Sequence, residues 1–159
     1  MGFFTADLCD NFSEKTEVLG PDFKFYGGNK KFKGEIITVK LDKNNKDLAA
    51  LLKNNNGVGK VVVVDVNMRY FAVVGDNLMK FANDNKYEGI IVNGYVRDTI
   101  TTKEFDIGLV AKGTCPRKYI PVQDGQIGVP LVIDEVEVNS GDYIYVDVDG
   151  IVICKEKLV

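Results

Sequence analysis

The chain has 159 residues, of which 27% are charged, and a formal net charge of -3 at pH 7. A chain of this length forms one domain whose core is stable without disulfide bonds or structural metals. Its mild negative charge argues against direct binding of nucleic acid. Histidine is absent, which excludes Ser-His and Cys-His nucleophiles and histidine-rich zinc or iron sites. Any chemistry therefore rests on carboxylates, arginine, lysine, tyrosine, cysteine or backbone amides, and any metal would be a hard cation.

The sequence predicts neither secretion nor membrane insertion. No apolar run reaches the ~18 residues of a membrane span, and the N-terminal "MGFFTADLCDNF" carries acids where a signal peptide would carry cations. Cys9, Cys115 and Cys154 are widely spaced and odd in number, which indicates reduced thiols. We expect a soluble protein of the cytoplasm.

Strands and helices alternate in the predicted order, and a β-rich tail follows them. Helices are indicated where apolar residues recur at helical spacing, and strands where they alternate or form β-branched runs. In chain order the predicted elements are a helix at 6–12, a strand at 34–41, a helix at 45–57, a strand at 60–66, a helix at 75–89, a strand at 89–93, and short strands within 106–113, 129–134 and 136–155. We expect a single α/β domain over residues 1–159, with a layered or barrel-like sheet around a βαβ unit.

The helix that follows "VVGDNL" begins with residues suited to binding an anion. Asp76 or Asn77 is the expected N-cap. The first backbone N–H groups of a helix have no partner within it and carry partial positive charge. Gly75 lets an anion approach the backbone closely. The segment from Gly75 through Asp76 and Asn77 to Leu78 can therefore hold a carboxylate or a phosphate.

The strand "GIIVN" then delivers Arg97 and Asp98, within "GYVRD", to the end of a predicted strand. In a βαβ unit the chain returns to the same edge of the sheet, so this strand end and the start of the helix should be neighbours. Arg97 can bind a carboxylate through two parallel hydrogen bonds, and Asp98 can bind a hard divalent cation. Taken singly, Asp76 is most simply a helix cap and Arg97–Asp98 a surface ion pair of little energetic value. Together they indicate a site for an anionic substrate and a metal.

Five stretches carry a resemblance to a known family: "TADLCDNF", "FYGGNKKFKGEIITVK", "GDNLMKFANDNKYEGIIVNGYVRD", "FDIGLVAKGTCPRK" and "SGDYIYVDVDGIVI". Over nearly its whole length the chain resembles the RraA-like proteins, which include regulators of ribonuclease activity and the class II 4-hydroxy-4-methyl-2-oxoglutarate aldolases. The aldolases of this family carry an Asp, then twenty residues, then Arg-Asp. Asp76, Arg97 and Asp98 match this motif position for position.

The resemblance implies a role for each of these residues. Arg97 would hold the keto acid and the growing enolate, and Asp98 would anchor Mg²⁺ or Mn²⁺, partly through waters. Asp76 would help to order a water on that metal. The amides of Gly75 to Leu78 would bind the pyruvyl carboxylate.

The resemblance also implies a fold and an assembly. The fold would be a layered β/β/α core like that of the swivelling phosphohistidine domains, with a mixed, barrel-like sheet. The assembly would be a homotrimer in which an acid from a neighbouring subunit completes the site, with Glu14, Glu17 and Glu35 as candidates.

Two functions follow as expectations. The first is a divalent-metal-dependent lyase that cleaves 4-hydroxy-4-methyl-2-oxoglutarate or decarboxylates oxaloacetate through a pyruvate enolate. The second is a non-catalytic regulator that binds and inhibits a ribonuclease or an RNA helicase. The ribonuclease regulators of the family tend to lack the second Asp of the motif, so Asp98 favours the enzyme. A third alternative is an enzyme fold kept for an unrelated role.

One departure from the family concerns the residues after "VVVVD". The family usually has small, glycine-rich residues there, whereas this chain has Val66, Asn67 and Met68. If that loop lines the pocket, it alters the shape of the pocket and the substrate preference.

Overall fold

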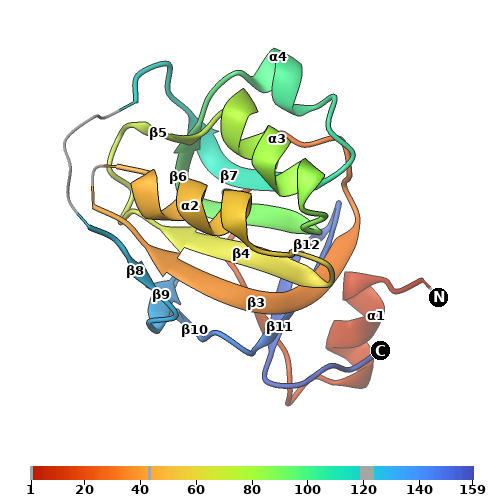
Figure 1. Ribbon diagram of the computed structural model, residues 1–159. Coiled ribbons are helices and arrows are strands. Elements are labelled where there is room, and N and C mark those ends of the chain that lie inside the picture. Colours follow the sequence, from red (N-terminus) through yellow and green to blue (C-terminus); the bar gives the residue numbers. More distant parts are fainter. Residues whose placement is uncertain (1, 43, 119–123) are drawn as a thin grey trace.

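The computed structural model describes residues 2–42, 44–118 and 124–159 (Figure 1). In chain order the elements are α1 (Thr5–Asn11), β1 (Glu17–Val18), β2 (Lys24–Phe25), β3 (Phe32–Lys40), α2 (Lys46–Asn54), β4 (Lys60–Asp65), β5 (Ala72–Val74), α3 (Asp76–Asp84), β6 (Gly89–Val96), α4 (Thr99–Thr102), β7 (Gly108–Thr114), β8 (Gln126–Ile127), β9 (Leu131–Ile133), β10 (Val136–Val138), β11 (Tyr143–Asp147) and β12 (Gly150–Cys154). Within these ranges no helix is both long enough and apolar enough to cross a membrane.

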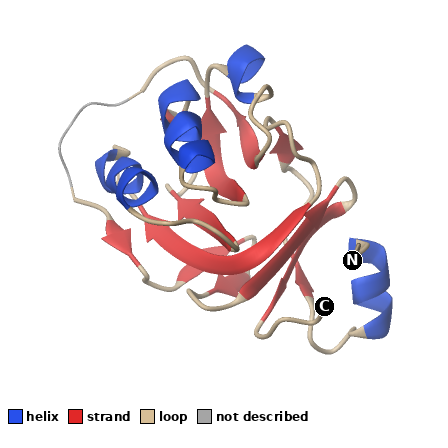
Figure 2. Ribbon diagram, turned by 45° about the vertical axis from the view of Figure 1, so that its right-hand side comes forward, coloured by secondary structure: helices blue, strands red, loops and turns tan. Residues whose placement is uncertain are grey.

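Most of the strands belong to one strongly curled sheet (Figures 1 and 2). Its order is β1-β12-β11-β3-β4-β6-β7-β2, with β5 beside the end of β6 and β8 beside the end of β3. The central strands β3, β4, β6 and β7 are parallel, whereas the strands at both ends pair antiparallel. The expected α/β fold with a mixed, barrel-like sheet is confirmed.

Strand β4 separates two hydrophobic cores. Its run of valines sends Val62 and Val64 to the core beneath the helices, and Val61 and Val63 to the core inside the curled sheet. All four are fully buried. Alternate side chains of a strand point to opposite faces, so a continuous apolar run fits a strand covered on both sides.

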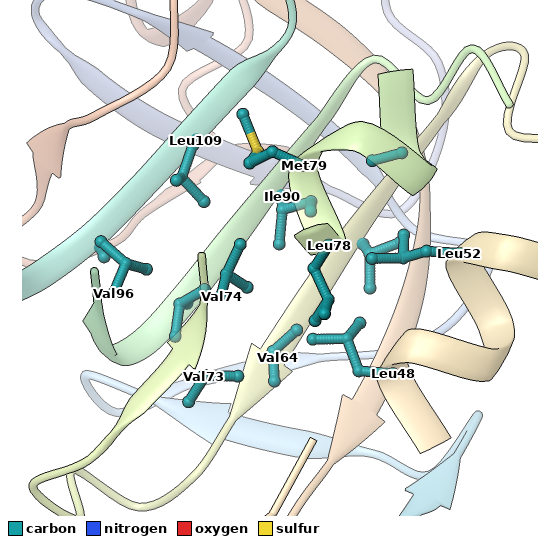
Figure 3. Close-up of a cluster of buried hydrophobic side chains, with 14 of the residues drawn as sticks. Leu48, Leu52, Val64, Val73, Val74, Leu78, Met79, Ile90, Val96 and Leu109 are labelled. Carbon is teal, nitrogen blue, oxygen red and sulfur yellow. The ribbon is translucent and has the colours of Figure 1, made fainter. Parts of the chain in front are cut away.

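Helices α2 and α3 cover one face of the parallel strands (Figure 2). Leu78 of α3 lies toward Leu48 and Leu52 of α2, and Met79 of α3 lies toward Leu109 of β7 (Figure 3). Burying a side chain of this size contributes roughly 1.5–3 kcal/mol. On the other face, the core inside the curled sheet is closed by β11, β12 and the β9–β10 hairpin, which gives the expected β/β/α layering.

Several element boundaries differ from the prediction, and two of them, the end of α3 and the end of β6, have a clear local reason. Helix α3 ends at Asp84 rather than near Gly89, because Lys86 adopts a left-handed φ of 64°. The N–H groups of Lys86 and Tyr87 then donate to the carbonyls of Asn83 and Ala82, which terminates the helix. Strand β6 extends beyond the predicted 89–93, because β5, which was not predicted, pairs with its last residues.

The parallel strands begin beneath one aromatic ring. Phe32 at the start of β3 lies across Gly89 of β6 and Gly108 of β7, and a Cβ on either glycine would overlap its ring. Phe32 is itself buried in the core inside the curled sheet. These two glycines are therefore required by packing and not by their backbone conformation.

We expect Gly108→Ala to lower the free energy of unfolding by about 1–3 kcal/mol, because the added methyl group overpacks the Phe32 ring. Urea unfolding of Gly108→Ala, Phe32→Leu and the double variant measures this coupling. The cost of the added methyl group should shrink in the Phe32→Leu background, where the ring is gone. Equal costs in both backgrounds would show that the ring is not what excludes the methyl group.

Candidate functional site

Two chain segments that carry the predicted site residues end side by side. Strand β5 leads into Gly75 and α3, and β6 leads into Arg97 and Asp98. Val74 is the register partner of Val96, and the N–H of Arg97 donates to the carbonyl of Val74 at 2.9 Å. The sequence-based expectation that the helix start and the strand end are neighbours is therefore confirmed as geometry.

The carboxylate of Asp98 lies against the first turn of α3. Its Oδ2 accepts a hydrogen bond from the backbone N–H of Asp76 at 3.0 Å. Gly75 permits this approach, because a Cβ there would overlap Asp98 Oδ2. A negative charge at a helix N-terminus is favourable. The anion-binding position predicted at Gly75–Leu78 is thus partly occupied by a side chain of the protein itself.

The backbone of Asp98 is strained. Its φ of 58° lies in the left-handed region, which costs a non-glycine residue roughly 1 kcal/mol or more. Aspartate tolerates this conformation better than most residues do. Residues held in such conformations are common at binding and catalytic sites, where the surrounding structure holds them in place.

The predicted capping of α3 is wrong. Asp76 is the first helical residue, Gly75 is the N-cap, and no side chain of the cap residue accepts a hydrogen bond. Asp98 reaches across from the end of β6 and takes the Asp76 N–H instead. Asp76 and Asn77 are exposed, so their side chains face solvent beside the helix N-terminus.

The guanidinium of Arg97 is held loosely. Its Nη1 donates to the carbonyl of Pro116 at 3.4 Å, and its Nε lies 4.0 Å from Asp98 Oδ2. Both side chains are about one-third exposed, and an ion pair of this length near solvent contributes little. Arg97 therefore keeps most of its hydrogen-bonding capacity for a ligand.

The structure adds two polar residues to this group. The depression between the two segments is also lined by Asn45 and Lys118, together with Ala72 and Val73. Asn45 Nδ2 donates to the carbonyl of Val73 at 2.9 Å, which fixes the start of α2 against β5. No spacing in the sequence links these two residues to the motif, so sequence reasoning missed them. We call Gly75–Leu78, Arg97, Asp98, Asn45 and Lys118 the strand-end site.

The strand-end site is small in a single chain. Its cavity measures about 40 Å³, room for roughly one water molecule. A larger cavity, of about 460 Å³, lies elsewhere, between the two ends of the curled sheet. That cavity is mainly apolar, with Asp149 as its one charged side chain among the lining residues. In spite of its size, it has fewer charged and polar side chains that could bind a substrate or a metal than the strand-end site has.

The oxygen donors of the strand-end site fit a hydrated hard cation. Asp98 Oδ2 is taken by the Asp76 N–H, while no described hydrogen bond uses Oδ1. Mg²⁺ keeps several waters and needs only one or two protein carboxylates. Over residues 2–42, 44–118 and 124–159 there is no group of three or more Cys, Asp or Glu side chains arranged to hold a metal. Asp98, with Asp76 close to it in the fold, therefore suits Mg²⁺ or Mn²⁺ and not a metal that requires a complete protein cage.

The cysteines lie outside the strand-end site. All three are free thiols, and Cys115 and Cys154 are buried. Burial raises the pKa of Cys154 to about 11, so this thiol stays protonated and a poor nucleophile at neutral pH. The expectation of reduced cysteines agrees with this arrangement.

Comparison with known proteins places the chain among relatives of similar length. A family model described as RraA-like, Aldolase/RraA, matches residues 5–153. A protein of Photobacterium profundum is 35% identical over 159 residues, with 99% of this chain and 97% of the relative covered. A protein of Bacillus cereus is 38% identical over 158 residues, with 97% of each covered. Both are provisionally named 4-hydroxy-4-methyl-2-oxoglutarate aldolase.

Two solved structures share the fold closely. One, from Geobacillus kaustophilus, is described as S-adenosylmethionine:2-dimethylmenaquinone methyltransferase; it is 35% identical with a TM-score of 0.93, covering 98% of this chain and 97% of its own. The other is the RNA-processing inhibitor RraA from Thermus thermophilis, 33% identical with a TM-score of 0.94, covering 100% and 96%. The relatives thus share one fold but carry names from three functional classes.

We expect Gly75→Ala to displace the Asp98 carboxylate from α3. The glycine has a φ of -134°, which alanine adopts freely, so the effect should come from the overlap with Asp98 Oδ2. Losing a contact of this capping type should cost about 0.5–2 kcal/mol of stability. Amide hydrogen exchange at Asp76 and thermal melting measure the effect, with Asp98→Ala as the background control. If Gly75→Ala costs as much in the Asp98→Ala protein, the carboxylate is not what the glycine accommodates.

Proposed function

Because the chain belongs to the RraA-like family, we propose that it is a divalent-metal-dependent lyase that acts on 2-keto acids at the strand-end site. It would cleave 4-hydroxy-4-methyl-2-oxoglutarate into two molecules of pyruvate, or decarboxylate oxaloacetate to pyruvate and carbon dioxide. Both reactions pass through the enolate of pyruvate, so one site can serve both. The aldolase names of the relatives support this proposal.

The observation that carries the proposal is the contact between Asp98 Oδ2 and the Asp76 N–H. It sets a carboxylate, a weakly engaged guanidinium and a helix N-terminus around one depression. The remaining N–H groups at the start of α3 suit the carboxylate of a keto acid. Arg97 can form two parallel hydrogen bonds to the same substrate and follow the charge that develops on its keto oxygen.

The other residues would orient the reactants and move the proton. Asp98 would hold the cation through Oδ1 while its Oδ2 stays on the Asp76 N–H, so the carboxylate cannot rotate freely. When bound, the cation supplies Lewis-acid stabilisation of the negative charge on the substrate. Asp76 would orient a water at the mouth and move a proton through its carboxylate.

In the aldol cleavage, the hydroxyl at C4 loses its proton and the C3–C4 bond breaks. One pyruvate leaves as the ketone, and the electron pair of the broken bond remains as the enolate of the second. In the decarboxylation, the bond to the departing carboxylate breaks and carbon dioxide leaves. The electron pair of that bond remains behind as the enolate of pyruvate. A proton added to the methylene carbon of the enolate then completes each reaction.

A homotrimer is part of the proposal. A cavity of about 40 Å³ is much smaller than the roughly 300 Å³ or more of a usual ligand pocket, so further walls are needed. A neighbouring subunit would supply them together with one acid. Glu35 already pairs with Lys60 at 3.1 Å, which leaves Glu14 and Glu17 as the more available candidates.

A second function is favoured by the likeness to the RNA-processing inhibitor RraA. In that case the protein would bind and inhibit a ribonuclease or an RNA helicase without chemistry of its own. Such a regulator has no need of a metal-binding carboxylate at the strand-end site. The presence of Asp98 therefore supports the lyase over the regulator.

We expect Arg97→Lys to lower kcat/KM for pyruvate release from oxaloacetate with Mg²⁺ by about 10²–10³, because a point charge replaces a planar fork. The matched control is Arg69→Lys, whose guanidinium pairs with Asp42 outside the strand-end site. Both variants should melt within a few degrees of the parent. Unchanged activity in a folded Arg97→Lys protein would make Arg97–Asp98 a surface ion pair and leave the regulator as the better account.

A further inference from the structure

A buried carboxylate outside the strand-end site connects the two segments that form it. Asp65, the last residue of β4, is 7% exposed. Its Oδ1 accepts hydrogen bonds from the backbone N–H of Asn67 at 2.8 Å and from Nδ2 of Asn93 at 3.0 Å. Asn93 is also buried and is the register partner of Asp65 on β6.

These two partners begin the two segments. Asn67 opens the loop that leads through β5 to Gly75 and α3. Asn93 precedes the last residues of β6, which lead to Arg97 and Asp98. One carboxylate oxygen thus binds both segments that lead to the strand-end site.

Strand β6 changes its neighbour at this point. Its pairing with β4 ends at Asn93, and Tyr95 and Val96 pair with β5 instead. The register against β7 also shifts between Val92 and Tyr95. Gly94 lies in this irregular stretch, and a Cβ there would overlap Val66. The path of β6 toward Arg97 is therefore set here.

The loop after β4 also depends on a hydrogen bond to Asp65. Asn67 and Met68 adopt left-handed φ values of 54° and 58°, a conformation that costs a non-glycine residue roughly 1 kcal/mol or more. The hydrogen bond from the Asn67 N–H to Asp65 compensates part of this cost and fixes the direction of the loop.

We propose that Asp65, acting through Asn93 and Asn67, is a positioning residue that aligns Arg97–Asp98 with the N-terminus of α3. It does not touch the substrate. Its effect on activity rests on the lyase function proposed above, whereas its effect on geometry does not. Small displacements of reacting groups are costly, since a shift of about 1 Å can lower a rate about 10²-fold.

The kinetic test compares three variants in oxaloacetate decarboxylation with Mg²⁺. We expect kcat/KM to fall about tenfold in Asn93→Ala and about 10²-fold in Asp65→Ala. Asp65→Asn should recover most of the activity, because its amide oxygen accepts the same two hydrogen bonds. In an Arg97→Lys background Asn93→Ala should add less than about a twofold loss, because the misaligned fork is already gone.

The matched control is Asp142→Ala. Asp142 is equally buried and caps a turn by accepting the N–H of Asn139 at 2.9 Å. It lies just before β11, outside the strand-end site, where its carbonyl accepts the N–H of Ile36 of β3. We expect this variant to lose stability but keep its kcat/KM. A similar kinetic loss in Asp142→Ala, or a loss in Asn93→Ala that is fully additive with Arg97→Lys, would overturn the proposal.

A structural readout separates this proposal from the proposed function. Amide hydrogen exchange at Asp76 reports the Asp98 contact whether or not the protein is an enzyme. We expect its rate to rise about tenfold in Asn93→Ala and to stay unchanged in Asp142→Ala. A parent without lyase activity would contradict the proposed function alone. An unchanged Asp76 exchange rate in Asn93→Ala would overturn the positioning role, and this variant remains informative if Asp65→Ala fails to fold.

Discussion

The hydrogen bond between the Asp98 carboxylate and the first N–H of α3 is the constraint on which the rest of the site depends. It joins the end of β6 to the start of a helix that follows a different strand. It requires Gly75, which leaves room for the carboxylate, and a left-handed Asp98, which turns the side chain back toward the helix. The pairing of Val74 with Val96 holds both segments at the distance this contact needs.

The local pattern of apolar residues in the sequence predicted much of the fold around the strand-end site. The valine run of β4 indicated a strand covered on both faces, and the structure sends its side chains to two cores. The strand and helix lengths between Asp76 and Arg97 predicted their proximity. By contrast, β5 is too short to show a period, and the end of α3 depends on a left-handed Lys86 where glycine would be the usual signal.

Long-range contacts account for what sequence reasoning missed. Asn45 and Lys118 reach the strand-end site from separate parts of the chain, and only the folded sheet brings them together. The sequence predicts Asp76 or Asn77 as the N-cap of α3 because local N-caps are common, whereas the acceptor comes from Asp98 across the β5–β6 pairing. The spacing of residues does not show when a distant side chain, and not a local one, accepts the first N–H of a helix.

The loop after β4 differs in sequence from the family without lining the strand-end site. Asn67 and Met68 keep a left-handed backbone where the family usually has glycine-rich residues. With Val66 and Arg69, Asn67 lines a separate cavity beside Lys40 and Asp42. The loop is absent from the lining of the strand-end site. Its composition therefore bears on the direction of β5 rather than on direct contact with a substrate there.

Binding of Mn²⁺, followed by the paramagnetic resonance signal of the free ion, tests the central claim most directly. The parent should bind Mn²⁺, and Asp98→Asn should bind it at least about tenfold more weakly. Asparagine tolerates the left-handed backbone and still accepts the Asp76 N–H, so the fold and the helix contact should survive. Asp149→Asn, in the large apolar cavity, is the matched control and should bind as the parent does. A parent that binds no Mn²⁺, or an Asp98→Asn protein that binds it equally well, would contradict the account.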